Sequence, residues 1–469
     1  MSDSTRPTPS PDGGANSLTR TGHMDACGLH LFTLAAACFL AAGGTGVLSA
    51  LASAASDAWL LLPLQNLRPM HTLFSIAGAI AGILAMTEAV IGKAHPGHRV
   101  SGAGTTLAMI ILFVVSAALS IALGYGSGRE YVSWHPVASV PLLAAMAASA
   151  LGIFRARMGL FHFFPEGAWL IGTGYAFVML GLIESHLWLW PWVGLDSVRD
   201  LTVQWHGIDL LFAGMNVALY GAAAVLVSRR QPTPRSSSLY AIALFSLLFT
   251  FGHHHYASPQ PGFLKTLAVL ASLLAIVSFL RHARAARRRE AHGVAPIWQA
   301  PVSAAATWTL VATGSGILLA IPQLNTLYHG TYAIVIHAMG SMIGVLFMLV
   351  IAGGLLVAGH FADAQRVRFG VRLVNGSLAA LWLYLLALGT FEGLARVATD
   401  PLLVSQHLRP WLAGFALLGA VLLAGISLLC LELIRVTHRA ARRALPGPPC
   451  ARLRVVAASA VAARDQDGQ

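Results

Sequence analysis

The chain has 469 residues, of which 56% are hydrophobic and 10% are charged, and its formal net charge is +12. Long apolar stretches alternate with short polar ones, which excludes a soluble globular fold and predicts a polytopic membrane protein. Unbroken runs of Leu, Ala, Val and Gly are typical of spanning helices rather than of alternating barrel strands. The predicted fold class is therefore all-α, with about twelve transmembrane helices, because roughly 20 residues cross the hydrocarbon.

Arginine and lysine gather in alternate loops between the apolar stretches. The loops that are rich in them carry Lys93 and Arg99, Arg155 and Arg157, Arg229 to Arg235, Arg281 to Arg289, Arg366 to Arg372, and a tail from Arg435. This asymmetry follows the positive-inside rule, which places both termini in the cytoplasm and the spans in a bacterial inner membrane. The net charge of +12 therefore predicts contact with anionic membrane lipid and not with nucleic acid.

The chain divides into three parts along its length. Residues 1–25 are rich in Ser, Thr, Pro and Gly and predict a disordered cytoplasmic tail. Residues 26–436 form the predicted transmembrane domain, and residues 437–469 form a basic cytoplasmic tail. The spans are expected near 28–54, 68–92, 103–124, 137–154, 168–188, 200–228, 238–256, 262–281, 302–322, 329–358, 373–395 and 409–435.

A run of three histidines, His253 to His255, ends the seventh predicted span. With the amino terminus inside, this run lies at the outer end of the span. His206 lies near the start of the sixth span, which is entered from the same side. Neutral imidazoles are good ligands for iron or copper, and several are needed to hold one ion. His206, His254 and His255 are therefore candidate ligands of one metal.

Two further histidines share this depth, His71 at the opening of the second span and His337 in the tenth. A single histidine in a membrane usually makes a hydrogen bond between helices, but four positions at one level favour a cofactor site. Successive helical residues turn by about 100°, so His337 and Met339 point to nearly opposite sides. One side can face the metal, and the other can complete a His/Met haem ligand pair with His71.

Four short motifs follow one another along the chain. They are Arg-Pro-Met-His at 68–71, Gly-Arg-Glu-Tyr at 128–131, His-His-His-Tyr at 253–256, and His-Gly-Thr at 329–331 followed by His337. Together they resemble the haem-copper oxidase superfamily, and most of all the large, haem-bearing subunit of bacterial nitric oxide reductase. The order and spacing match from the first span to the tenth.

The resemblance implies a role for each matching residue. His337 would be the proximal ligand of a high-spin haem b, and His71 an axial ligand of a low-spin haem b. His206, His254 and His255 would hold a non-haem iron, or a copper. Arg129 is expected to contact the cofactors, and Glu130 falls where the family has a glutamate on a structural Ca²⁺, although a loop ion pair is the plainer interpretation. His253 stands where the family usually has glycine, and His329 matches a family histidine that is not an iron ligand; both are expected to lie beside the ligands or at the membrane interface.

Two departures from the family pattern affect this interpretation. Met339 replaces the second histidine of the low-spin haem. Leu210 replaces a glutamate that helps to bind the non-haem iron, and Asp209, one position earlier, can present a carboxylate from nearly the same helix face. The tyrosine of oxygen-reducing relatives is also absent, because the corresponding positions are Leu210 and Leu248.

The expected activity is the reduction of two NO molecules to N2O and water. Electrons would come from a cytochrome c-type subunit or from quinol, through the low-spin haem. Two alternatives stay open. One is a cbb3-like oxygen reductase, and the other is a non-catalytic haem- or metal-binding membrane protein, which would suit the missing acids.

Overall fold

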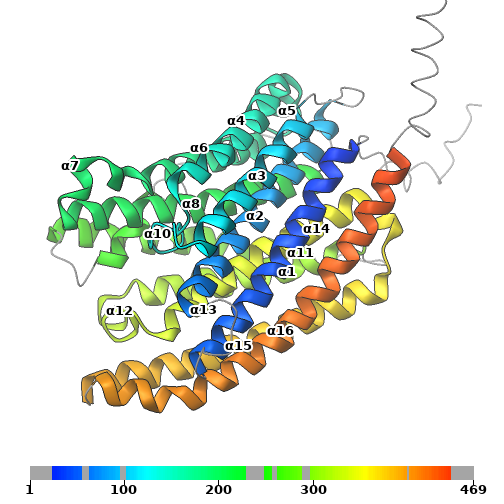
Figure 1. The fold of residues 1–469 in the computed structure, drawn as a ribbon. Helices are drawn as coiled ribbons and strands as arrows, with labels where there is room; N and C mark the ends of the chain where they lie inside the picture. The colour runs from blue at the N-terminus through cyan, green and yellow to red at the C-terminus, as the bar shows by residue number, and fades with distance from the viewer. Residues whose placement is uncertain are drawn as a thin grey trace, which may run out of the picture.

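The computed structural model describes residues 24–54, 63–95, 102–228, 248–255, 261–287, 296–398 and 401–444, and within these ranges the side chains other than those of 253–255, 275–287, 398 and 401–407. Every regular element in these ranges is a helix. Ten helical segments among them are long and apolar enough to cross a membrane. Figure 1 shows the helices packed side by side in one elongated bundle. The predicted all-α membrane fold is confirmed.

The spanning helices follow the predicted order. They are α1 (Ala26–Ala54), α2 (Leu64–Ala94), α3 (Ala103–Ala122), α4 (Ser139–Arg155), α6 (Pro165–Glu184), α8 (Ser197–Val227), α11 (Gln299–Leu319), the continuous run α13 (Tyr332–Met339), η7 (Gly340–Phe347) and α14 (Met348–Ala358), then α15 (Ala364–Ala398) and α16 (Pro401–Ala444). α10 (Gly262–Arg287) takes the place of the eighth predicted span and has a shorter apolar stretch, Gly262–Leu274. α16 continues to Ala444, so its last residues belong to the segment that was predicted as the basic tail, 437–469.

Short helices connect several of these spans. They are η4 (Pro136–Ala138), α5 (Arg157–Phe163), η5 (Leu187–Leu189), α7 (Pro191–Gly194), η6 (Thr250–His255), α12 (Pro322–Tyr328) and η8 (Gly359–Phe361). η6 carries the end of the seventh predicted span, 238–256, and residues 238–247 of that span lie outside the described residues. Most of both predicted tails, 1–23 and 445–469, also lies outside them.

Two spans form the interior of the bundle. In the most apolar stretch of α2, 89% of the residues are buried inside the bundle, and in that of the span from Tyr332 to Phe361 the share is 78%. In α3 only 28% of the corresponding residues are buried. Aromatic packing joins this interior to α1, because the rings of Phe39 and Phe347 meet edge to face at 5.1 Å. These interior spans are also the ones that carry His71 and His337.

Glycines bring α6 and α8 into direct backbone contact. They recur every seven residues in both helices and pair in antiparallel order, Gly167 with Gly221, Gly174 with Gly214, and Gly181 with Gly207. A methyl carbon built at Gly174 would lie 2.7 Å from the Gly214 carbonyl oxygen, and one at Gly181 would lie 2.5 Å from the Gly207 oxygen. Small residues of this kind drive helix association in lipid because they let backbones approach closely. We call these six residues the glycine zipper.

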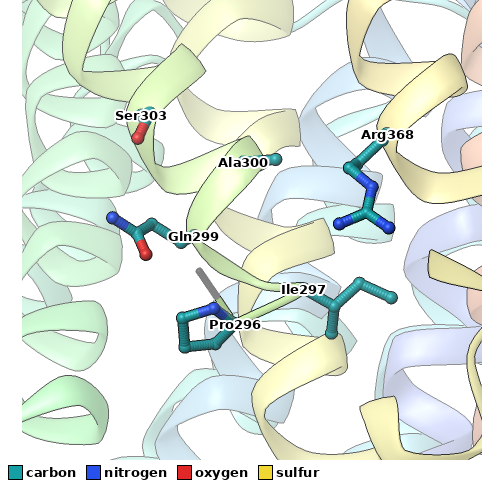
Figure 2. Close-up of a pocket in the computed structure, with 6 residues that line it drawn as sticks. All are labelled: Pro296, Ile297, Gln299, Ala300, Ser303 and Arg368. Carbon is teal, nitrogen blue, oxygen red and sulfur yellow. The ribbon is translucent and has the colours of Figure 1, made fainter. Parts of the chain in front are cut away.

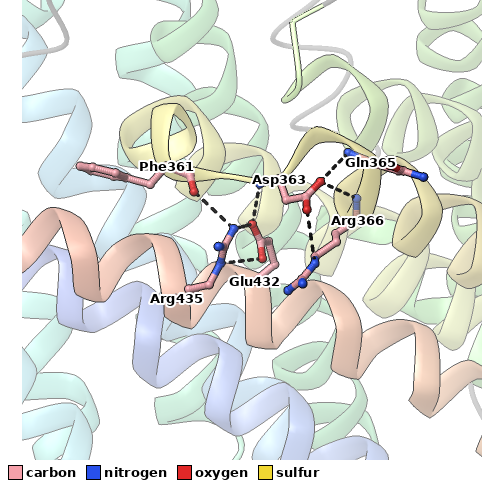
Figure 3. Close-up of polar contacts among 6 residues, drawn as sticks. All are labelled: Phe361, Asp363, Gln365, Arg366, Glu432 and Arg435. Carbon is pink, nitrogen blue, oxygen red and sulfur yellow. Dashed lines mark hydrogen bonds and ion pairs between the residues drawn. The ribbon is translucent and has the colours of Figure 1, made fainter.

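Polar contacts tie the helix ends together on the side where α14 and α16 end. Figure 3 shows Glu432 of α16 accepting a hydrogen bond of 2.7 Å from the Asp363 backbone N–H while pairing with Arg435. Arg435 also donates to the Phe361 carbonyl. On the same side, Lys93 donates to three carbonyl groups at the end of α8, at distances of 2.6 to 2.7 Å. Lys93 therefore caps a helix in addition to contributing to the positive loop charge.

A small pocket lies between the start of α11 and α15. It has a volume of about 180 Å³, and Figure 2 shows Arg368 beside apolar side chains at its wall. It is remote in sequence from the predicted site histidines.

Candidate functional site

His71 stands in the third turn of α2 and leans on α1. Its Nδ1 lies 2.7 Å from the Ala42 carbonyl oxygen. One turn further along α1, Gly46 leaves room for the ring, because a methyl carbon there would lie 2.7 Å from Nδ1. The carbonyl can only accept, so Nδ1 carries the proton and the lone pair remains on Nε2. A half-buried His71 is thus fixed in the tautomer that suits a metal ligand.

His337 in α13 is held by the same arrangement on a different helix. Its Nδ1 lies 2.9 Å from the Ala312 carbonyl oxygen of α11. Gly316 follows Ala312 by four residues, and a methyl carbon there would lie 2.8 Å from the ring carbon Cε1. In both cases a carbonyl orients the ring and a glycine one helical turn later accommodates it. His337 therefore also keeps its lone pair on Nε2.

A π-helix, η7, follows these residues directly. It covers Gly340–Phe347, and Met339 lies half-buried at its junction with α13. Such wide turns are rare and occur frequently at functional sites. Within η7, Ser341 accepts a hydrogen bond of 3.2 Å from Asn216 of α8. The regular geometry of α13 turns Met339 away from His337, as expected from the sequence, and haem ligation by Met339 stays a prediction.

His206 lies in the third turn of α8 and contacts two other elements. Its Nδ1 is 2.6 Å from Oε2 of Glu184, the last residue of α6. The ring packs edge to face on Phe251 of η6 at 4.8 Å, and it also interacts with the Leu248 backbone. Both side chains of the His206–Glu184 pair are largely shielded, with 28% and 25% of their surfaces exposed.

Asp209 faces the segment that carries the three consecutive histidines. Its Oδ2 accepts a hydrogen bond of 2.8 Å from the Thr250 hydroxyl group at the start of η6. The structure therefore brings the backbone of η6 against the face of α8 that bears His206 and Asp209. The side chains of His253, His254 and His255 lie outside the described residues, so the three-histidine metal site stays a prediction. Among the described side chains, no three His, Cys, Asp or Glu residues gather to hold a metal.

The two leucines that depart from the family pattern belong to one apolar cluster. Leu210 is 2% exposed and packs with Phe177 and Ala213, and Leu248 lies against the same cluster. The positions of the glutamate and the tyrosine are thus occupied by apolar side chains, which pack α6, α8 and the residues just before η6 together. The two departures are coupled in space, because a polar group at either position would be buried among apolar neighbours.

The loop between α3 and η4 fastens the end of the bundle where α2 and α8 begin. Arg129 pairs with Asp200 at 2.5 Å and donates to Gln204 at 3.1 Å, both on α8. Glu130 pairs instead with Arg68 of α2, at 3.3 Å. The loop ion pair of Arg129 with Glu130 is therefore replaced by two pairs that reach neighbouring helices, and the Ca²⁺ role of Glu130 stays a prediction.

Tyr131 completes this loop in a left-handed conformation, with φ of 63°. Its ring packs edge to face on Phe212 of α8 at 5.2 Å. Burial raises the pKa of the Tyr131 phenol to about 12. Three consecutive loop residues thus contact α8, α2 and α8 again, which fixes the two helices relative to each other.

These contacts place two of the predicted histidines, His71 and His206, near one loop. Arg68 lies three residues before His71, and Gln204 two residues before His206. At about 1.5 Å of rise per residue, both residues lie within roughly 5 Å of the loop-contacting residue of their own helix. His337 lies on α13, which also begins at this end of the bundle. We call this part the histidine end of the bundle; it lies toward the left of Figure 1, where α7 and α12 are labelled.

Sequence reasoning missed Glu184. An acidic residue at the end of an otherwise apolar span is itself a signal, because placing it there costs free energy.

The buried ring atoms Trp188 Nε1 and His329 Nδ1 have no hydrogen-bond partner among the described residues. Trp188 stacks under Arg129, 5.2 Å from its guanidinium carbon, and such orphaned polar atoms are uncommon in folded proteins.

The fold is similar to that of a solved structure. The structure is similar to a chain of a haem-copper terminal oxidase dimer solved by cryo-electron microscopy, with a TM-score of 0.68 and 12% sequence identity. The match covers 88% of this chain and 83% of the other. No family model and no curated protein sequence matches the chain. At this identity the likeness establishes a bundle of the haem-copper oxidase type.

Proposed function

We propose that this chain is a haem-bearing subunit that reduces nitric oxide to nitrous oxide in a bacterial inner membrane, with both termini in the cytoplasm. The observation that carries the proposal is the shared arrangement of His71 and His337. Each ring has its Nδ1 on a backbone carbonyl and a glycine beside it. Two interior histidines oriented alike, at one end of a bundle of this fold, support a pair of haem ligands.

The residues present fit the implied haem groups. A histidine that ligates iron usually donates its other ring N–H to a carbonyl or carboxylate, which fixes the ring orientation. His71 and His337 both meet this requirement. In the proposal His337 would hold a high-spin haem b, and His71 together with Met339 would hold a low-spin haem b. Arg129, stacked on Trp188 at the histidine end, would contact the haem carboxylates, and Glu130 would hold the Ca²⁺.

A non-haem iron, or a copper, would be held by His206, His254 and His255. When bound, the two metals would supply Lewis-acid and redox chemistry for the reaction in which two NO, two electrons and two protons give N2O and water. The chain itself contributes two carboxyl groups beside His206, those of Glu184 and Asp209. Four residues after His206, Leu210 belongs to an apolar cluster with Phe177 and Ala213. A cytochrome c-type subunit or quinol would deliver the electrons.

Oxygen reduction is the second candidate. The structural neighbour is a terminal oxidase, which favours dioxygen for that protein. In this chain Leu210 and Leu248 fill an apolar cluster at the positions where oxygen-reducing relatives carry a tyrosine, which favours NO. The third candidate, a haem-binding protein without turnover, predicts bound haem with no reductase activity.

Membranes that contain the wild-type chain or His337→Ala separate these candidates. With an artificial electron donor, we expect anaerobic NO consumption by the wild type and none by the variant. Oxygen consumption without NO consumption would replace the proposal by the oxidase. Bound haem without consumption of either gas would replace it by the non-catalytic protein.

A further inference from the structure

Glu184 is an acidic side chain to which the functional proposal gives no specific task, and its hydrogen bond to His206 is shorter than those that hold the His71 and His337 rings. It ends α6, whose other acidic residue, Glu166, lies exposed in the first turn. Its Oε2 lies 2.6 Å from Nδ1 of His206. A carboxyl group three-quarters shielded from solvent in a spanning segment is costly unless a partner offsets its desolvation.

The glycine zipper fixes this contact at the level of the backbone. In its last pair, Gly207 directly follows His206, and Gly181 lies three residues, or about one helical turn, before Glu184. A methyl carbon at Gly207 would lie 3.0 Å from the Glu184 Cβ and 3.0 Å from the Gly181 oxygen. Because α6 and α8 touch here without intervening side chains, neither helix can rotate or slide without breaking the zipper. The position of the carboxylate relative to the His206 ring is therefore set by helix packing.

Neighbouring polar residues have other partners. Asp209, one turn after His206, accepts from Thr250. Gln204, two residues before it, accepts from Arg129. Among the described side chains, Glu184 is thus the group that holds the His206 ring by a charged hydrogen bond.

We propose that Glu184 is a positioning residue for the second metal, which holds the His206 ring through Nδ1 and so leaves Nε2 as the nitrogen that a metal would take, in exchange for the contact of the ring with the Leu248 backbone. This inference rests on the proposed function. An ionised carboxylate only accepts hydrogen bonds, so it selects the Nδ1–H tautomer. The negative charge also makes Nε2 a stronger donor to a metal, and loss of such a partner typically lowers metal affinity by roughly 10 to 100-fold.

The test measures metal affinity by chelator competition, using iron and copper as separate probes on the purified full-length chain. We expect Glu184→Ala to weaken binding by about 10 to 100-fold. We expect Glu184→Gln to weaken it less, because the amide oxygen still accepts from Nδ1 but carries no charge. Glu166→Gln, at the opposite end of the same helix, should bind metal as the wild type does. Haem content, measured on each sample, reports whether the bundle has folded.

Two outcomes overturn the inference in different ways. If His206→Ala keeps the metal, the proposed metal site is wrong, and the role of Glu184 falls with it. If His206→Ala loses the metal but Glu184→Ala and Glu184→Gln both bind it as the wild type does, with haem retained, the metal site stands and the positioning role is wrong.

Discussion

At the scale of single residues, the site is defined by how imidazole rings are held. His71 and His337 rest on carbonyl groups of different helices, and His206 rests on a carboxylate. The two kinds of partner polarise the ring differently. A neutral carbonyl polarises it weakly, whereas a carboxylate gives it partial negative character. The two proposed haem ligands and the proposed ligand of the second metal therefore differ in the group that holds Nδ1.

The glycine beside His71 gives a residue-scale prediction. In Gly46→Ala the new methyl group would lie 2.7 Å from Nδ1, so the ring must turn away from the Ala42 carbonyl. We expect the variant to lose the low-spin haem, as measured by the absorption spectrum of the reduced protein. Gly44→Ala, on the same helix with no atom within 4 Å of the added carbon, should keep it. Equal spectra for the two variants would contradict the role of His71.

Sequence patterns single out His71, His206 and His337, because each is a rare polar residue in an apolar span, and their roles as ligands stay predictions. Glu184 carries the same signal, but its partner is 22 residues away on another helix. Hydropathy locates spans along the chain without indicating which faces meet. The apolar cluster of Leu210 and Leu248 was hidden for the same reason, since the two positions come together through packing alone.

At the scale of elements, packing of α6 on α8 determines the region around His206. The seven-residue repeat of glycine in both spans is visible in the sequence and would have predicted their pairing, since small residues at regular spacing mark close helix contacts. The π-helix η7 has no comparable signal, because it depends on how the tenth span fits between its neighbours. Span order was predictable, whereas this local departure was not.

The glycine zipper predicts a large effect from a small substitution. In Gly174→Ala the methyl carbon would lie 2.5 Å from the Ala218 backbone nitrogen. We expect the free energy of unfolding in detergent to fall by about 1–3 kcal/mol, the usual cost of overpacking. Gly172→Ala, two residues earlier with no atom within 4 Å, should be neutral or slightly stabilising. A loss of stability in Gly172→Ala equal to that in Gly174→Ala would argue against the zipper.

The start of α15 gives a pH prediction. Asp363 accepts hydrogen bonds from the backbone N–H groups of Gln365 and Arg366 and pairs with the Arg366 side chain, and these contacts lower the pKa of its carboxyl group below 3.8. A lowered pKa in the folded state means that the ionised group contributes stability above pH 3.8, which is lost as the pH falls through the folded value.

The pH dependence of this stabilisation can be measured by comparing the thermal unfolding of the wild type and Asp363→Asn. We expect the wild type to be more stable at neutral pH, because asparagine caps the helix without the charge. The difference should shrink below pH 3.8, where the carboxyl group becomes protonated. A difference that does not change with pH would show that the charge of Asp363 contributes nothing.

At the scale of the whole molecule, the fold joins distant parts of the chain at the histidine end. The loop of Arg129 and Glu130 links α2 to α8, and Arg68 interacts with Tyr332 at the start of α13. The likeness to a haem-copper terminal oxidase chain extends over 88% of the sequence at 12% identity. The arrangement of helices is therefore shared much further than the side chains, and chemistry must be tested on this chain itself.

The most direct test of the account is the cofactor content of the purified full-length chain. A pyridine haemochrome assay combined with metal analysis should find b-type haem together with non-haem iron or copper. His71→Ala and His337→Ala should each remove a different haem signal, and His206→Ala should remove the second metal while leaving haem in place. A folded wild-type chain that binds no haem when haem is supplied would contradict the central claim.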